Sequence, residues 1–215
     1  MPRPPGTRNQ DFAEKKLALV QKLADFLLSD DVELPSFRQM AIAADTSEPT
    51  LRHYFGDRSG VIIAVMAHIG KLAEPFREHT RKPSDSIEEA IRSFHRVIMQ
   101  TRDNTRMLAA HAFGLRESMS DPLARKAYLQ YIVEPNIDAV AERLVKSRGG
   151  PTNYQTARSL AMMLASSSMF LVVHQNLLDG ALHKPIDVGN QFNLVQSWLI
   201  DGVANNPEAL SREDV

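Results

Sequence analysis

The chain has 215 residues, of which 43% are hydrophobic and 24% charged, and its formal net charge is −1. This balance is typical of a folded protein with one large or two small domains, and it excludes a wholly disordered chain. The sequence contains no cysteine, which excludes disulfide frameworks, thiolate metal sites and cysteine nucleophiles.

The first ten residues, MPRPPGTRNQ, lack the apolar segment of a secretory signal. The longest uncharged apolar run covers residues 160–173, which is shorter than the roughly 20 residues that span a bilayer. We therefore expect a cytoplasmic protein that does not enter a membrane.

Helical spacing of apolar residues recurs along the chain, and almost nothing has the alternation of a strand. It predicts a helix over residues 12–29 and two short helices over 36–44 and 48–55, with Ser36 as the N-cap of the first short helix. Only a polar turn, residues 45–47, separates the two short helices. This is the helix-turn-helix layout, in which the second helix lies in the major groove of DNA.

The second short helix carries side chains that can reach bases and phosphates. Thr50, Arg52, His53 and Tyr54 are all hydrogen-bonding residues. Leu51 and Phe55 are four residues apart and are expected to face the core. Spacing alone leaves two interpretations open, namely DNA binding and two surface helices with ordinary polar faces.

Residues 12–66 resemble the TetR family of bacterial transcriptional regulators. In that family a helix like Phe37–Ala44 supports a recognition helix that ends in an aromatic pair like Tyr54–Phe55. A basic residue, here Arg58, then opens the next helix. The resemblance implies that Thr50 and Tyr54 contact phosphates and that Arg52 contacts a base or a phosphate.

The same resemblance places Arg38 and Arg58 on flanking phosphates. The full predicted DNA-binding set, which centres on the second short helix, is Arg38, Ser47, Glu48, Pro49, Thr50, Arg52, His53, Tyr54 and Arg58.

Three features depart from the family pattern or weaken the DNA-binding interpretation. The turn carries Asp45-Thr46, where the family usually has glycine and an apolar residue, and aspartate tolerates left-handed geometry less easily than glycine. Ser59-Gly60 stands where acidic helix formers are usual. Residues 1–58 also hold eight basic and nine acidic side chains, so charge alone predicts weak non-specific affinity for DNA. Asp30, Asp31 and Glu33 cluster where they could point away from DNA.

A longer helix is predicted over residues 58–79, with Asp57 as its cap. It is expected to be the only element that touches both halves, and Gly60 is expected to give its base backbone freedom. Gly60→Ala is therefore expected to leave ligand and DNA binding intact but to change the coupling between them. Five further helices are predicted, with a kink at Pro135 in the third of them, over residues 86–101, 105–118, 122–147, 153–178 and 187–205. The predicted domains are residues 1–60 and 61–205, followed by a loose tail over 206–215.

By resemblance of layout, the second half binds a small effector, and its last two helices pair with a second subunit. Residues 160–173 are apolar on every side, which one subunit does not easily bury, although a central helix of a monomer is the alternative. The expected dimer interface contains Leu171, Phe192, Val195, Trp198 and Leu199. The expected pocket, whose residues could also be plain core, contains Met99, Met107, His111, Phe113, Tyr131, Met163, Phe170 and His174.

The seven histidines show no metal-binding spacing, and residues 166–168 lie mid-helix without a nucleophile elbow. We therefore predict no catalytic residue, metal or cofactor. The sequence favours an all-α, homodimeric repressor that releases a palindromic operator in double-stranded DNA when a small apolar effector binds. Two alternatives are an all-α enzyme with its active site in a C-terminal cavity and a helical interaction module without DNA binding.

Overall fold

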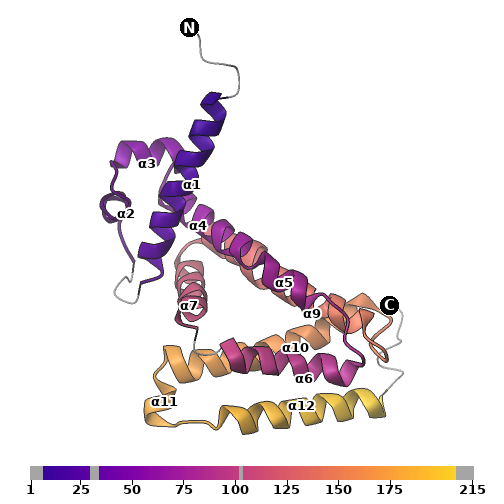
Figure 1. Cartoon of the computed structure of the whole chain (residues 1–215). Helices are drawn as coiled ribbons and strands as arrows, with labels where there is room; N and C mark the ends of the chain where they lie inside the picture. The colour runs from indigo at the N-terminus through magenta and orange to yellow at the C-terminus, as the bar shows by residue number, and fades with distance from the viewer. Residues whose placement is uncertain (1–6, 30–33, 102–103, 207–215) are drawn as a thin grey trace. The chain divides into compact units, whose positions relative to one another are not determined.

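The structure is a computed structural model that describes residues 7–29, 34–101 and 104–206 (Figure 1). Every regular element in these ranges is a helix, which confirms the predicted all-α class. The acidic residues 30, 31 and 33 and the predicted tail beyond residue 206 lie outside the described ranges. The elements are α1 Thr7–Leu27, α2 Phe37–Ala43, α3 Glu48–Phe55, α4 Arg58–Leu72, α5 Glu74–Thr80, α6 Ile87–Thr101, α7 Thr105–Ser120, α8 Pro122–Tyr128, η1 Leu129–Val133, α9 Glu134–Lys146, α10 Tyr154–Val172, η2 Val173–Leu177, α11 Gly180–His183 and α12 Val188–Asn205.

Polar side chains fix where the helices begin, as the sequence predicts. Ser36 accepts a hydrogen bond from the backbone of Gln39, whose side chain accepts one from the backbone N–H of Ser36. This reciprocal capping box satisfies two N–H groups that the first turn leaves free. Asp57 and Asp187 cap α4 and α12 by a single hydrogen bond each, in which one carboxylate oxygen accepts from the backbone N–H three residues ahead.

The long helix predicted over residues 58–79 is wrong, because the structure breaks it at Ala73 into α4 and α5. Pro75 gives the physical reason. It has no N–H to donate, and its ring clashes with the carbonyl of Lys71 in a continuous helix. The proline was visible in the sequence, so this break could have been predicted.

The predicted helix over residues 122–147 is also interrupted rather than simply kinked. It consists of α8, one π-helical turn η1, and α9 with Pro135 in its first turn. Pro135 cannot donate to the carbonyl of Tyr131, and the wider π turn accommodates the change. A Cβ on Gly70 of α4 would lie 2.5 Å from this carbonyl oxygen, so only glycine permits the close approach of η1.

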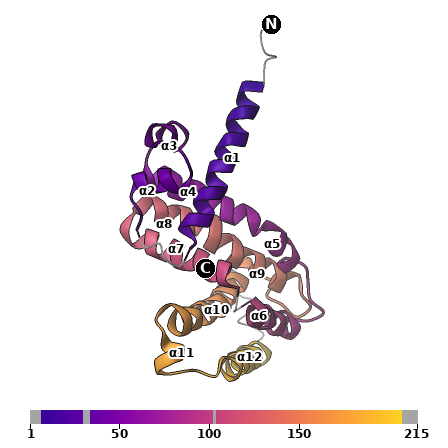
Figure 2. The same ribbon diagram turned by 60° about the vertical axis from the view of Figure 1, so that its left-hand side comes forward.

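The chain divides into two compact units. Unit 1 contains Met1–Ala73 and Ala109–Ile132, and unit 2 contains Glu74–Leu108 and Val133–Val215. In unit 1, α2 and α3 lie side by side next to α1 (Figures 1 and 2). The first boundary between the units along the chain thus falls after Ala73, and α8 belongs to the same unit as the N-terminal helices. The division by function at residue 60 stays a prediction.

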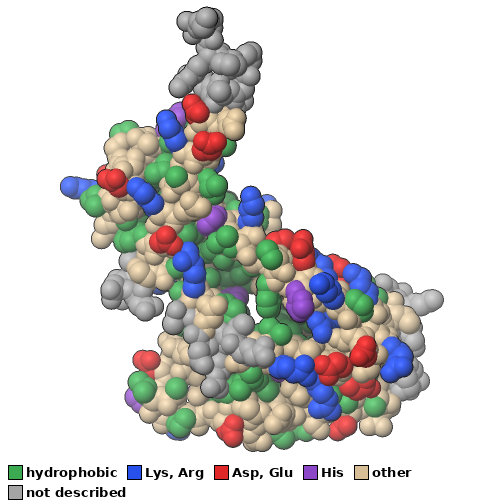
Figure 3. All heavy atoms as spheres, viewed as in Figure 1, with side chains coloured by type: hydrophobic (Ala, Val, Ile, Leu, Met, Phe, Trp, Pro, Cys, Tyr) green, Lys and Arg blue, Asp and Glu red, His purple; other side chains and the backbone are tan. Residues whose placement is uncertain are grey.

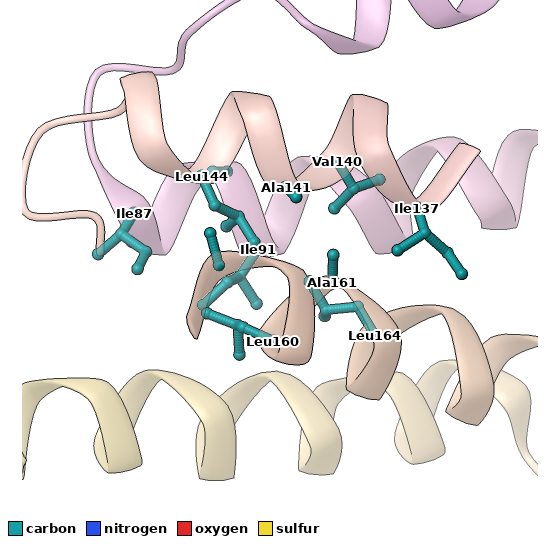
Figure 4. Close-up of a cluster of buried hydrophobic side chains, with 11 residues drawn as sticks. Ile87, Ile91, Ile137, Val140, Ala141, Leu144, Leu160, Ala161 and Leu164 are labelled. Carbon is teal, nitrogen blue, oxygen red and sulfur yellow. The ribbon is translucent and has the colours of Figure 1, made fainter. Parts of the chain in front are cut away.

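Unit 2 has its core where α6, α9 and α10 meet (Figure 4). Ile87 and Ile91 of α6 are one helical turn apart, so their side chains share one face. The core contains the buried residues Ile87, Ala90, Ile91, Ile137, Val140, Ala141, Leu144, Ala157, Leu160, Ala161 and Leu164. Leu199 of α12 packs on this core and is partly buried there.

One continuous helical segment in the described ranges, Tyr154–Leu177, is long and apolar enough to cross a membrane by length and composition. In addition, α4 and α5 pass this test only when taken together as a bent pair. Within the segment Tyr154–Leu177, 33% of the most apolar stretch is buried. This helix therefore buries one side in unit 2 and leaves apolar side chains on its surface.

Candidate nucleic-acid interface

The turn between α2 and α3 has a defined geometry. The backbone N–H of Thr46 donates to the carbonyl of Ala41, and that of Asp45 donates to the carbonyl of Ile42. This is the Schellman arrangement that ends many helices, and it requires a left-handed residue. Asp45 takes that conformation with φ of 53°, as the sequence predicts for this turn. The short turn holds α3 directly after α2.

The two faces of α3 are separated by burial. Leu51 is fully buried with Met40 and Ala41 of α2, whereas Phe55 is half-buried and lies under the Lys16 ammonium, 5.4 Å from its ring centroid. The opposite face holds the predicted contact residues. Of these, Ser47, Pro49, Arg52 and His53 are exposed, and Glu48, Thr50 and Tyr54 are half-buried. All the residues between 47 and 54 that were predicted to contact DNA therefore lie together on α3 and at its cap.

The start of α3 is fixed by its cap. The Ser47 hydroxyl accepts a hydrogen bond from the backbone N–H of Thr50 at 3.3 Å. The two hydroxyl groups are 2.8 Å apart and share another hydrogen bond. Because Ser47 and Thr50 hold each other, their side chains have a fixed arrangement at the start of α3.

Aromatic contacts also order this face. The Arg52 guanidinium lies over the Phe37 ring, 5.2 Å from its centroid. This cation–π interaction holds the Arg52 side chain against Phe37. Phe12 of α1 contacts both His53 and Tyr54, with ring centroids 5.7 and 4.6 Å apart. Sequence reasoning missed Phe12, because it lies beside the apolar stripe used to predict the first helix. Its aromatic character was the available signal.

Arg38 is exposed on α2, as expected for a phosphate contact, but Arg58 is engaged inside unit 1. The Arg58 Nε donates to the carbonyl of Pro35, and both terminal nitrogens donate to the carboxylate of Glu117. All three nitrogens thus have protein partners. The phosphate role that the family resemblance implies for Arg58 conflicts with this arrangement.

Gly60 also differs from its prediction. A Cβ at this position would lie 1.8 Å from the carbonyl oxygen of Phe55, a backbone atom that cannot move aside cheaply. The glycine therefore permits a close approach between the end of α3 and the start of α4. This close approach argues against the expectation that Gly60→Ala leaves ligand and DNA binding intact, because the backbone must shift to admit a methyl group.

Charge over the N-terminal helices is mixed. Figure 3 shows Lys and Arg side chains interspersed with Asp and Glu on this face of α1, α2 and α3, without one continuous basic patch. Attraction to phosphates falls with fewer neutralising cations. Binding here would therefore depend on a few placed contacts rather than on a strong overall field.

The predicted pocket residues are divided between the two units. His111, Phe113 and Tyr131 belong to unit 1, where the His111 ring is 2.9 Å from the Tyr128 hydroxyl and burial lowers the pKa of His111. Met99, Met107, Met163, Phe170 and His174 belong to unit 2. Met163 and Phe170 are 57% and 68% exposed, so they lie on the surface of α10. A surface groove in unit 1 contains none of the predicted residues and is lined by Lys22, Asp25, Phe26, Gln39, Ile42 and Ala43.

The predicted dimer residues also separate by exposure. Trp198 is 69% exposed, whereas Val195 and Leu199 are half-buried. Leu171 and Phe192 are only 6% and 3% exposed, so they belong to the core of their own unit. The reason is that α10 and α12 turn one side inward, which an all-round apolar sequence does not reveal.

His95 of α6 was not among the predicted pocket residues, yet it is the most unusual polar group in unit 2. It is fully buried, and neither ring nitrogen has a hydrogen-bond partner. Its ring stacks on Phe192 at a centroid distance of 4.5 Å. Burial lowers its pKa to about 4, so the ring is neutral near pH 7. No sequence motif marked it.

Across the part of the chain that the structure describes, no group of three or more His, Asp or Glu side chains could hold a metal ion.

The fold and the exposed α3 define an all-α chain with a helix-turn-helix motif at its N-terminus and a helical body. Solved structures share this architecture. GusR of Salmonella enterica aligns with a TM-score of 0.60 and 14% identity, over 89% of this chain and 96% of GusR. A protein of Rhodococcus sp. described as a TetR-family transcriptional regulator aligns with a TM-score of 0.57 and 18% identity, over 90% and 99%.

A protein of Mesorhizobium loti with the same description has a TM-score of 0.53 and 11% identity, over 90% of this chain and 97% of that one. No family model and no curated protein matches the sequence. The chain therefore has the fold of TetR-family regulators, which the sequence resemblance predicted, and the likeness is one of fold.

Proposed function

We propose that this chain is a TetR-type transcriptional regulator that binds double-stranded DNA through α3. The observation that carries the proposal is the division of α3 into a buried face at Leu51 and an ordered polar face at Arg52, His53 and Tyr54. The short turn and the length of α3 fit a helix that enters the major groove. The fold shared with TetR-family regulators supports the same proposal.

Selection of bound sequences from random double-stranded DNA tests this proposal directly. A protein that reads DNA should enrich one palindromic motif, with half-sites one helical turn or a multiple of it apart. Enrichment of no sequence over the input would reject it. Arg52→Ala should then lower affinity and relax base preference at one position of each half-site, by roughly 1–3 kcal/mol for a bidentate contact. An equal loss for every sequence would make Arg52 a phosphate contact instead.

The second part of the proposal is a homodimer, formed by α10 and α12. Exposed apolar residues recur at helical spacing on both helices, with Met163 and Phe170 on α10 and Leu194 and Trp198 on α12. Such an uncovered surface is typical of a protein–protein interface. Leu171 and Phe192, which are buried in their own unit, are assigned to the core beneath this surface and not to the interface itself. A dimer also explains how one α3 from each copy could meet a palindromic site.

The third part is regulation by a small, largely apolar effector that causes release of the operator, so that the chain acts as a repressor. His95 is the polar group that we assign to this effector, in place of the exposed Met163 and Phe170. A neutral imidazole offers one donor and one acceptor, and the Phe94 and Phe192 rings that contact it make its surroundings apolar. We therefore expect an uncharged ligand with a hydroxyl or carbonyl group.

A further inference from the structure

The first turn of α4 is bonded to three other segments of unit 1. Arg58 Nε donates to the carbonyl of Pro35 at 3.0 Å, and its terminal nitrogens donate to the two Glu117 oxygens at 2.7 and 2.9 Å. Next to it, the Ser59 hydroxyl donates to Asp121 at 2.5 Å. Pro35 precedes the cap of α2, Glu117 lies in the last turn of α7, and Asp121 caps α8. The same short segment thus holds α2, α7 and α8.

The burial of these groups shows how strongly they depend on each other. The Glu117 side chain is fully buried, whereas the Arg58 side chain is 30% exposed. A buried carboxylate needs a partner that supplies charge and hydrogen bonds, and the two-pronged guanidinium contact supplies both. Pro35 is buried as well, so its carbonyl also needs the donor that Arg58 provides. Separation of Arg58 from Glu117 would leave an unpaired charge inside unit 1.

We propose that Arg58 and Glu117 form a clasp that positions the helix-turn-helix motif on α7, and that Arg58 does not contact a DNA phosphate. In this arrangement Arg58 acts on DNA binding through Pro35 and α2, which supports α3. The inference rests on the proposed DNA-binding function and deepens it. It assigns Glu117, an acidic residue far from α3 in sequence, to the set that determines operator affinity.

The clasp also offers a route for regulation. The helix α7 begins at Thr105 in unit 2 and ends with Glu117 to Ser120 in unit 1. Since a helix transmits displacement along its axis, a shift of α7 would reach α2 through Glu117 and Arg58. The clasp therefore connects the recognition motif to a helix that the two units share.

Charge and salt dependence separate a positioning role from a phosphate contact. A lysine at position 58 keeps the positive charge but cannot make the two-pronged contact with Glu117. A phosphate-binding residue would tolerate that change, whereas a clasp would not. Loss of one phosphate contact also lowers the slope of log affinity against log salt by about 1.

The experiment uses the full-length protein and the duplex that the wild type selects from random DNA. Affinity is measured at several salt concentrations for Arg58→Lys, Glu117→Gln and the double variant, at a temperature where circular dichroism shows each to be folded. The matched control is Arg38→Ala, an exposed arginine on α2. It should weaken binding and reduce the salt slope by about 1.

For the clasp, we expect each single variant to bind about tenfold more weakly with an unchanged salt slope. The double variant should be no weaker than the weaker single variant, because both changes remove one contact. The proposal is overturned if Arg58→Lys binds like the wild type, or if Glu117→Gln leaves affinity unchanged or raises it. If Glu117→Gln does not fold, the result for Arg58→Lys decides alone. A wild type that selects no DNA would instead reject the proposed function.

Discussion

The buried, unpartnered His95 predicts a specific loss of stability in mild acid. Its pKa in the folded protein is about 4 because burial disfavours the charged ring, against 6.5 for an unperturbed histidine. Between these values the unfolded chain binds a proton that the folded chain does not. The contribution of His95 to stability is therefore fully present above about pH 6.5 and is lost as the pH drops toward 4. The change His95→Phe removes the titrating group while keeping a flat ring against Phe192.

The expected magnitude follows from the difference between the folded and unfolded pKa values of His95. A tenfold change in proton affinity corresponds to about 1.4 kcal/mol, so His95 accounts for a total loss of about 3 kcal/mol across the whole window. Between about pH 7.5 and pH 5.5 its share is about 1.3 kcal/mol. His111, whose pKa is also lowered by burial, should add a loss of the same sign. The wild type must therefore lose more stability than His95→Phe over this range.

Urea unfolding followed by circular dichroism, at one protein concentration and both pH values, measures this difference. The larger phenylalanine ring changes packing equally at both pH values, so only the pH-dependent part is compared. Ile91→Val, fully buried one turn away on α6, is the control. It should cost stability without changing the pH dependence. If the wild type and His95→Phe differ by the same free energy at both pH values, His95 is not a buried neutral group and the reasoning is refuted.

Three further predictions concern the turn, the junction and the dimer. Asp45→Gly should stabilise the protein by about 1 kcal/mol in thermal unfolding, because glycine removes the cost of φ at 53°; a lower melting temperature would contradict this. Gly60→Ala should weaken binding to a selected duplex and lower stability, since its methyl group meets a backbone oxygen, and wild-type values for both would show that the junction adapts. Trp198→Glu should give a folded monomer in ultracentrifugation and Leu171→Glu an unfolded chain, because only Leu171 is buried in its own unit. A monomeric wild type at micromolar concentration would reject the dimer.

The sequence was sufficient for the helices whose ends depend on local chemistry. Ser36 and Asp57 cap the helices that they were predicted to cap, and Asp187 caps the helix predicted to begin at residue 187. A side chain that bonds to the backbone three residues ahead acts within one turn, so sequence is enough to place it. The turn at Asp45 follows for the same reason. Leu51 was correctly predicted to be buried, since its helix has one clear apolar face.

Properties that depend on distant partners could not be predicted in this way. Arg58 has the position of a phosphate-binding residue, and only the tertiary structure shows Glu117, 59 residues later in the chain, as its partner. His95 carries no signal in sequence, because its burial arises where α6 meets Phe192 of α12. For α10, apolar residues on every side leave open which of them face the core. The structure shows that even two adjacent residues differ, since Phe170 is exposed and Leu171 is buried.

The division into two units changes the basis for the proposed regulation. The sequence suggested a single lever, residues 58–79, between the DNA-binding and effector-binding halves. In the structure the chain passes between units at three places, namely Ala73–Glu74, Leu108–Ala109 and Ile132–Val133. The first lies at the helix break before Pro75, and the third lies at the end of the π turn η1. The helices are interrupted at these two crossings, whereas α7 passes its boundary without interruption. Of the three crossings, α7 is therefore the one made by an uninterrupted helix. Glu117 lies at the end of that helix, so the proposed clasp with Arg58 would join α7 to the segment that leads into α2.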